Sequence, residues 1–266
     1  MKHKLPLCVI TTAILLAGCS LPFGAKKNSP TPTPSSQGER LTLQQAPFTT
    51  LTVTANKESG VVTGHTFAMQ LQNLLTTPKT LEYLILYDLP DDRQQGIPGS
   101  IELTGSNSAS RKDLFMGSCS KTCRYDQGVA NGTVQLTYRD ESGGAIGDII
   151  GNWHLQTGNK LLTSVSSDFI FEMDAKPSGW FITMTGLGLP APLENKVIGG
   201  PYVITSSGAS NLSGVVKFKL TSPSNGAKIL LWDSQRWKEL NINLKLDGQI
   251  ISASTDSLGT FVVVAS

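Results

Sequence analysis

Two short acidic stretches contain the side chains best suited to hydrolytic chemistry. Residues 88–92 include three aspartates, and residues 140–148 include two aspartates and a glutamate around a Gly-Gly step. A glycosidase needs two carboxyl groups about 5–10 Å apart, and calcium needs several oxygen ligands from one loop. Neither stretch has the spacing of a calcium loop, so we expect solvated turn carboxylates and no metal site. A hydrolase that acts on glycans or peptides through these residues is the alternative function.

The histidines beyond the N-terminal region provide no coherent catalytic set. His65 follows a glycine at an expected turn, and His154 follows a tryptophan in an expected strand. The chain has no Gly-Xaa-Ser-Xaa-Gly motif, the turn that exposes the nucleophile of many serine hydrolases. We therefore assign no catalytic residue and expect that the chain is not an enzyme.

Aromatic residues provide the best binding candidates. Trp232 and Trp237 flank one short turn of sequence Asp-Ser-Gln-Arg. Exposed aromatic faces stack on sugars and on the side chains of partner proteins, whereas large aromatics in small β-domains more often fill the core. A single sequence does not show exposure, so both interpretations stay open, with Trp232 and Trp237 as possible ligand-binding residues.

Short apolar runs with a period of two extend from residue 41 to the end of the sequence. Gly, Pro, Asn, Asp and Ser separate these runs, which is typical of β-strands joined by turns. Residues 81–87 are apolar at nearly every position and are expected to form a strand covered on both faces. Residues 67–75 fit a strand or a short helix. The expected strands cover residues 51–55, 67–71, 81–87, 133–138, 169–173, 180–184, 216–220, 228–232, 237–240, 242–246, 250–254 and 260–264.

These strands predict an all-β protein of two β-sandwich, immunoglobulin-like units. With 266 residues, of which 39% are hydrophobic, the chain is long enough for two cores. A stretch rich in Gly and Pro at residues 186–192 indicates a linker or a tight crossing. We accordingly expect one domain at residues 41–188 and a smaller antiparallel domain at residues 193–266.

The N-terminus has the organisation of an export signal. Two lysines precede a short apolar run, and the sequence Leu16-Ala17-Gly18-Cys19 follows. The run is too short for a permanent transmembrane helix. This arrangement resembles the signal peptide of bacterial lipoproteins. The resemblance implies that residues 1–18 are removed and that Cys19 carries a diacylglycerol and an amide-linked fatty acid such as palmitate.

The same resemblance implies a location. A lipidated Cys19 would anchor the chain to a bacterial membrane on its extracytoplasmic face. A serine directly after the cysteine, here Ser20, resembles the arrangement in lipoproteins that are sorted to the outer membrane or the cell surface. Residues 19–40 are rich in Pro, Thr and Ser, with proline at alternate positions from 30 to 34. Such a segment is expected to be a disordered, extended tether between the membrane and the folded part.

Export also bears on the remaining cysteines. With Cys8 removed and Cys19 lipidated, only Cys119 and Cys123 remain. In an oxidising compartment, two thiols this close in a stretch flanked by Gly and Ser are expected to form a local disulfide. Zinc or redox chemistry is the alternative, but no second Cys or His pair completes a metal site.

The last strands carry a second resemblance. A strand that ends in Trp232, a hairpin through Trp237 and a Gly-Thr-Phe strand at residues 259–261 are similar to the closing strands of ZU5-like and other bacterial surface β-sandwich domains. The resemblance implies a sandwich fold and no particular activity.

Charge argues against one class of partner. Two of the 22 basic residues lie in the signal peptide, which leaves 20 against 20 acidic residues. A neutral chain has no electrostatic reason to bind nucleic acid. Together these observations predict a lipid-anchored cell-envelope protein with a non-catalytic binding or assembly role. Its partner is expected to be an envelope protein or a glycan, and it is expected to use no cofactor beyond the lipid on Cys19.

Overall fold

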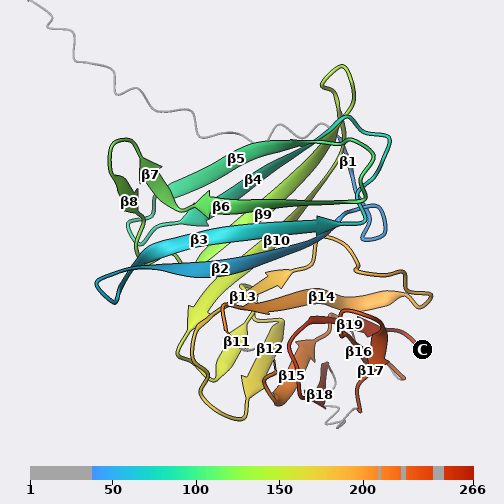
Figure 1. The fold of residues 1–266 in the computed structure, drawn as a ribbon. Helices are drawn as coiled ribbons and strands as arrows, with labels where there is room; N and C mark the ends of the chain where they lie inside the picture. Colours follow the sequence, from blue (N-terminus) through green and yellow to red (C-terminus); the bar gives the residue numbers. More distant parts are fainter. Residues whose placement is uncertain (1–37, 209–210, 223–225, 242–248) are drawn as a thin grey trace, which may run out of the picture. The chain divides into compact units, whose positions relative to one another are not determined.

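The computed structural model describes residues 38–208, 211–222, 226–241 and 249–266. The predicted signal peptide, Cys19, nearly all of the predicted tether and the predicted strand at residues 242–246 lie outside the described residues. Every regular element in the described part is a β-strand (Figure 1), so the prediction of an all-β fold is confirmed. Residues 67–75, which fitted either a strand or a helix, begin inside a strand that ends at Gln72.

The described residues form four sheets. Their strands are β1 (Glu39–Arg40), β2 (Phe48–Glu58), β3 (Val61–Gln72), β4 (Thr80–Asp88), β5 (Gln94–Glu102), β6 (Ser108–Phe115), β7 (Gly117–Cys119), β8 (Cys123–Tyr125), β9 (Asn131–Arg139), β10 (Ala145–Thr157), β11 (Leu161–Thr163), β12 (Phe169–Met173), β13 (Trp180–Thr185), β14 (Val197–Ser206), β15 (Gly214–Lys219), β16 (Lys228–Trp232), β17 (Trp237–Glu239), β18 (Ile250–Thr255) and β19 (Thr260–Val264). The largest sheet has ten strands, in the order β17-β16-β19-β14-β13-β10-β9-β4-β5, with β1 paired to β10. The other sheets are β11-β12-β15-β18, β2-β3-β6 and the hairpin β7-β8.

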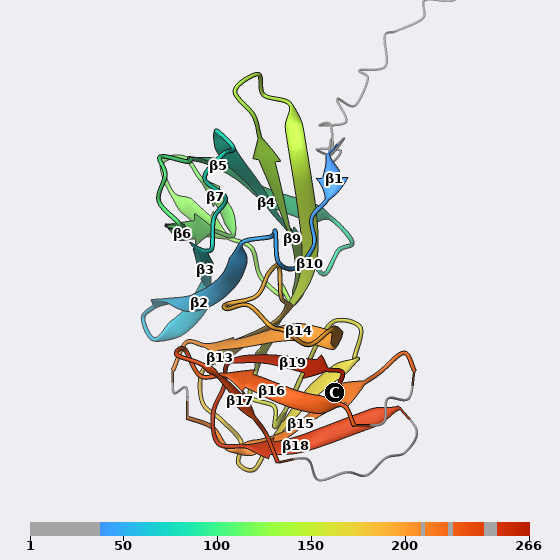
Figure 2. The same ribbon diagram turned by 90° about the vertical axis from the view of Figure 1, so that its right-hand side faces the viewer.

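Figure 2 shows smaller sheets facing parts of the large sheet. Two large hydrophobic cores lie between these sheets. The first lies between the sheet β2-β3-β6 and strands β4, β9 and β10, and it contains Phe67 packed against Trp153 with ring centroids 5.0 Å apart. The second lies between β12-β15-β18 and the β13-to-β16 end of the large sheet, and it contains Phe169, Phe218 and Phe261. The predicted pair of sandwiches is therefore present, and both are built on one continuous sheet.

Strand β10 joins the two sandwiches. One of its edges pairs with β9 from Ala145 to His154. Its other edge pairs with β13 from Trp153 to Thr157 and, nearer its start, in parallel with β1. Because each edge is hydrogen-bonded to a neighbour, β10 lies inside the sheet and not at its border.

Strand β13 is buried on both faces. Ile182 and Met184 point into the first core. Phe181, the residue before Ile182, points into the second core. We expected this environment for residues 81–87 instead. That strand, β4, alternates between buried and half-buried residues because only one of its faces lies against the core, so Leu84 and Leu86 stay half-buried.

The division between the two cores does not coincide with the predicted division between residues 188 and 193. Strand β12 precedes that division, yet it pairs with β15 and its side chains fill the second core. The Gly- and Pro-rich stretch at residues 186–192 is a crossing, in which Leu187 and Leu189 are buried. Turn residues show where a chain changes direction, but they do not show which core a strand joins.

The hairpin β7-β8 contains the predicted disulfide. Cys119 and Cys123 are paired across the hairpin and their sulfurs are bonded. The bond closes a small local loop, so it restrains the hairpin and does not connect the two cores.

Candidate functional site

The two acidic stretches lie at opposite ends of the sheet. Strands β4 and β9 are antiparallel, with Thr80 opposite Arg139 at one end and Tyr87 opposite Gly132 at the other. The first stretch follows Tyr87 and the second follows Arg139. At about 3.3 Å per residue, the paired ends are roughly 23 Å apart, well beyond the roughly 5–10 Å between catalytic carboxyl groups. The two stretches therefore do not combine into one catalytic pair.

Within the second stretch the carboxylates have structural partners. Asp140 Oδ1 accepts hydrogen bonds from the Ser142 hydroxyl at 2.6 Å, the Ser142 N–H at 2.9 Å and the Gly144 N–H at 2.8 Å. These bonds, that from the Ser142 hydroxyl first, hold the pKa of Asp140 below its usual value. Asp148 is buried and pairs with Arg40 at 3.1 Å. Among the described residues no three potential metal ligands lie together.

The histidines have the contacts of packed side chains. His65 is buried and lies edge-on to Trp180, with ring centroids 4.1 Å apart. Its Nε2 has no hydrogen-bond partner in the described part of the chain, and burial lowers the pKa of the imidazole. The Nδ1 of His154 lies 3.0 Å from the carbonyl oxygen of Thr163.

The environment of His65 predicts a loss of stability on acidification. Because its pKa is lowered in the folded state, the unfolded chain takes up a proton first as the pH falls below about 6.5, so the free energy of unfolding decreases. In His65→Phe this part of the decrease is expected to disappear, with no loss of stability near pH 7.5 because an unpartnered polar atom is removed. Melting temperatures measured from pH 7.5 to pH 5 check this. If the melting temperature falls equally with pH in the variant and in the unchanged protein, the prediction is contradicted.

Trp232 and Trp237 form a cross-strand pair. They are directly opposite each other in β16 and β17, with ring centroids 5.4 Å apart. Both side chains are half-buried. They are therefore neither fully exposed, as the ligand-binding interpretation predicted, nor fully buried in the core, as the alternative predicted. Trp237 packs beside a small third core around Leu189, and its Nε1 donates a hydrogen bond to the carbonyl of Ala191 at 3.3 Å. Trp237 therefore has a structural role, and Trp232 lies half-buried beside it.

The turn between the tryptophans is fixed by Asp233. Its Oδ1 accepts hydrogen bonds from the N–H groups of Gln235 at 3.0 Å and Arg236 at 2.9 Å. Its Oδ2 pairs with Lys238 Nζ at 2.7 Å. Lys238 is the main cause that keeps the pKa of Asp233 far below its usual value. The turn that presents Trp232 is therefore held in one shape at neutral pH.

A groove of about 250 Å³ runs beside Trp232; we call it the Trp232 groove. It lies where the sheet β2-β3-β6 meets the large sheet, since β2 packs against β13 and β14. No charged side chain lines it. Seven polar or aromatic residues from five strands line it, namely Phe48, Thr50, Gln70, Gln72, Thr205, Trp232 and Thr260. Of these, sequence analysis found only Trp232; Gln70 and Gln72 could be identified as outward-facing from their alternation with apolar residues, but not as neighbours of Trp232.

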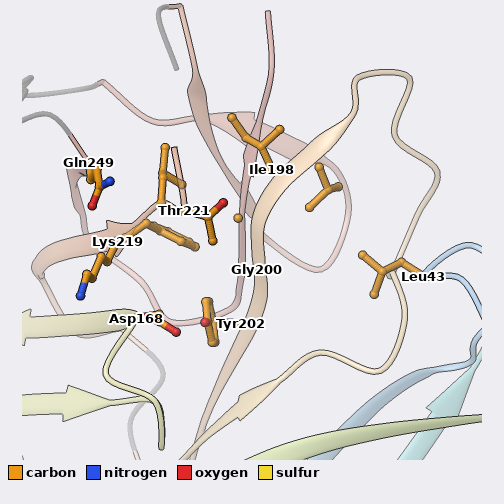
Figure 3. A pocket seen from close by; sticks show the side chains of 12 residues that line it. Leu43, Asp168, Ile198, Gly200, Tyr202, Lys219, Thr221 and Gln249 are labelled. Carbon is orange, nitrogen blue, oxygen red and sulfur yellow. The ribbon is translucent and has the colours of Figure 1, made fainter. Parts of the chain in front are cut away.

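A larger cavity of about 470 Å³ lies beside β14 and β15 (Figure 3). Figure 3 shows Lys219 and Gln249 on one side of it and Leu43 on the other. Tyr202 in its lining stacks on Phe169 at 4.8 Å, and burial raises the pKa of the phenol.

Comparison with protein-family models, with curated proteins and with solved structures finds no significant match for this chain. Within the described residues there is no helix of sufficient length and hydrophobicity to span a membrane.

Proposed function

We propose that this chain is a lipid-anchored protein of the bacterial cell envelope whose folded part binds a ligand or partner without catalysing a reaction. The Trp232 groove is the observation that carries the binding role. It is lined by aromatic, amide and hydroxyl groups and by no carboxylate, histidine or cysteine. General acid–base catalysis needs a titratable group beside the reacting bond, so this lining is suited to recognition.

The anchor rests on the sequence. Leu16-Ala17-Gly18-Cys19 supplies the lipidation site, and the Pro-rich residues that follow supply the tether. The predicted tether extends two residues too far, because Glu39 and Arg40, its last residues, form β1 and pair with β10. A diacylglycerol together with an amide-linked chain on one residue gives stable membrane attachment, which a single acyl chain does not.

Replacing Cys19 with alanine is expected to release the protein from the membrane. Without the thiol no diacylglycerol can be attached, so the variant should lose all incorporation of an alkyne-labelled fatty acid and should not be processed at residue 18. Fractionation of cells and metabolic labelling check this. Cys8→Ala is the matched control, because it removes a cysteine inside the predicted signal peptide and should keep the label. Wild-type labelling of Cys19→Ala would contradict the anchor.

The binding role is tested by photocrosslinking in intact cells. A photoreactive amino acid at Gln72, in the groove, is expected to capture a discrete partner or ligand, whereas the same group at Glu141, in a remote turn, is not. The hydrolase alternative has its own test, since substitution of the exposed carboxylates in the two stretches (Asp88→Asn, Asp91→Asn, Asp92→Asn and Glu141→Gln) should leave every phenotype unchanged. Loss of a hydrolytic activity in such a variant would contradict the proposed non-catalytic role.

A further inference from the structure

The wall of the Trp232 groove formed by β2 and β3 presents free amides. Phe48 is directly opposite Gln72, and Thr50 is directly opposite Gln70, so their side chains lie on one face of the hairpin. The residue between the two glutamines, Leu71, is buried in the first core, so the glutamines point away from it. Both are exposed, and neither amide has a hydrogen-bond partner in the described part of the chain. Each therefore offers donors and an acceptor to a ligand.

On the side of the large sheet, the groove is lined by one aromatic side chain, Trp232, in a fixed position. In β16, Ile229 and Leu231 point into the second core, and Trp232 lies on the other face of the strand. Its ring is in contact with that of Trp237, with an angle of 61° between the ring planes, and the adjoining turn is held by Asp233. A rigid aromatic loses little conformational entropy when a ligand stacks on it.

The accessible groups of the groove are polar apart from the indole. The three apolar residues of its lining are Phe48, Val203 and Ile204, and they are only 7%, 2% and 3% exposed. An apolar peptide side chain would find no pocket among them. The absence of charge in the lining gives no attraction for an anionic ligand. Thr260 is likewise only 2% exposed, and the Thr205 hydroxyl donates a hydrogen bond to the carbonyl of Leu51. What remains is the two glutamine amides, the hydroxyls of Thr50 and Ser234, and one indole.

This combination matches the chemistry of a sugar ring, whose hydroxyl groups pair with amides while its C–H face packs on an aromatic side chain. The volume of about 250 Å³ is below the roughly 300–1,000 Å³ of pockets that enclose a whole ligand, so the groove accommodates a short segment of a longer chain. Extending the binding role proposed above, on which this step rests, we infer that the Trp232 groove binds a neutral oligosaccharide, with one ring stacked on Trp232 and its hydroxyls bonded by Gln70 and Gln72.

Calorimetric titration of the full chain, purified in detergent, tests the inference. The probes are cellohexaose, maltohexaose and chitohexaose, three neutral hexasaccharides that differ in linkage or substituent. At least one is expected to bind. Trp232→Ala and the double variant Gln70→Ala/Gln72→Ala should each weaken that binding by about tenfold or more. Gln95→Ala is the matched control, because it removes an exposed amide from β5, at the other end of the large sheet from β16, and it should bind as the unchanged protein does.

Two results would overturn the inference. One is that none of the three hexasaccharides binds, and the other is that binding persists unchanged in both groove variants. The photocrosslinking experiment separates either result from failure of the proposed function. If the photoreactive group at Gln72 captures a protein, the groove remains a binding site, but for a different class of partner. If it captures nothing and no hexasaccharide binds, both the oligosaccharide inference and the proposed binding role are contradicted.

Discussion

Replacing Phe169 with alanine is expected to lower the free energy of unfolding by about 3–5 kcal/mol. Phe169 is fully buried in the second core, where its ring lies 4.8 Å from Tyr202, 5.0 Å from Phe218 and 5.8 Å from Phe261. Three aromatic neighbours cannot all collapse into the space left by the missing ring, so most of the cavity should remain. Denaturant unfolding followed by tryptophan fluorescence measures the loss.

The same variant tests whether the two cores unfold together. Since β13 contributes side chains to both cores, we expect one transition that shifts as a whole. Ile170→Ala is the control, because Ile170 is the next residue along β12 and is only half-buried, so its cost should be clearly smaller. A two-step transition in which Phe169→Ala moves only one step would show instead that the sandwiches are independently stable.

Gly132→Ala is expected to destabilise the first core by about 3 kcal/mol or more. A Cβ at this position in β9 would lie 2.0 Å from the carbonyl oxygen of Leu86 and 2.4 Å from the ring of the buried Trp153. The first obstacle is backbone of the adjacent strand β4, so relief requires that the pairing of β4 and β9 opens. Thermal melting and hydrogen exchange of the β4 and β9 amides measure the effect.

The control for Gly132 is another glycine with room beside it. At Gly208 a Cβ would meet nothing closer than 3.8 Å, so Gly208→Ala should change the melting temperature little. A Gly132→Ala protein as stable as Gly208→Ala would mean that β9 can shift away from β4 at no cost, in conflict with the packing described above.

Local alternation predicted much of the fold. Strands β2, β9 and β12 were recognised because burial on one face of a strand leaves a period of two in the sequence. Strands β5 and β6 were among those missed, and so was β14. It contains Gly199, Gly200 and Pro201, residues that normally indicate a turn, and its pairing with β19 is irregular at that point. The partners of each strand were also not predictable, because hydrogen bonding to a strand far away in the chain leaves no local pattern.

The candidate site divides in the same way. Cys119 and Cys123 were identified as a disulfide from their spacing, and that prediction is confirmed. Trp232 was identified as a candidate because tryptophan side chains stack on ligands, a property of the residue type alone. Gln70 and Gln72 lie more than 150 positions earlier in the chain, and only the packing of β2 against β14 brings them opposite Trp232. The carboxylates near Asp88 and Asp140 show the reverse case, since the antiparallel pairing of β4 and β9 separates them.

The position of β1 determines how mechanical force would enter the protein. The Arg40–Asp148 ion pair and a 2.9 Å bond from the Leu41 N–H to the carbonyl of Asp148 attach this strand to β10. If the chain is held at Cys19, as proposed, a pull along the tether reaches β1 first. Because β1 is parallel to β10, a pull along the strand axis loads their bonds in shear, and several bonds must then break at once. The load next passes into a strand that both sandwiches share, so it is divided between β9 and β13.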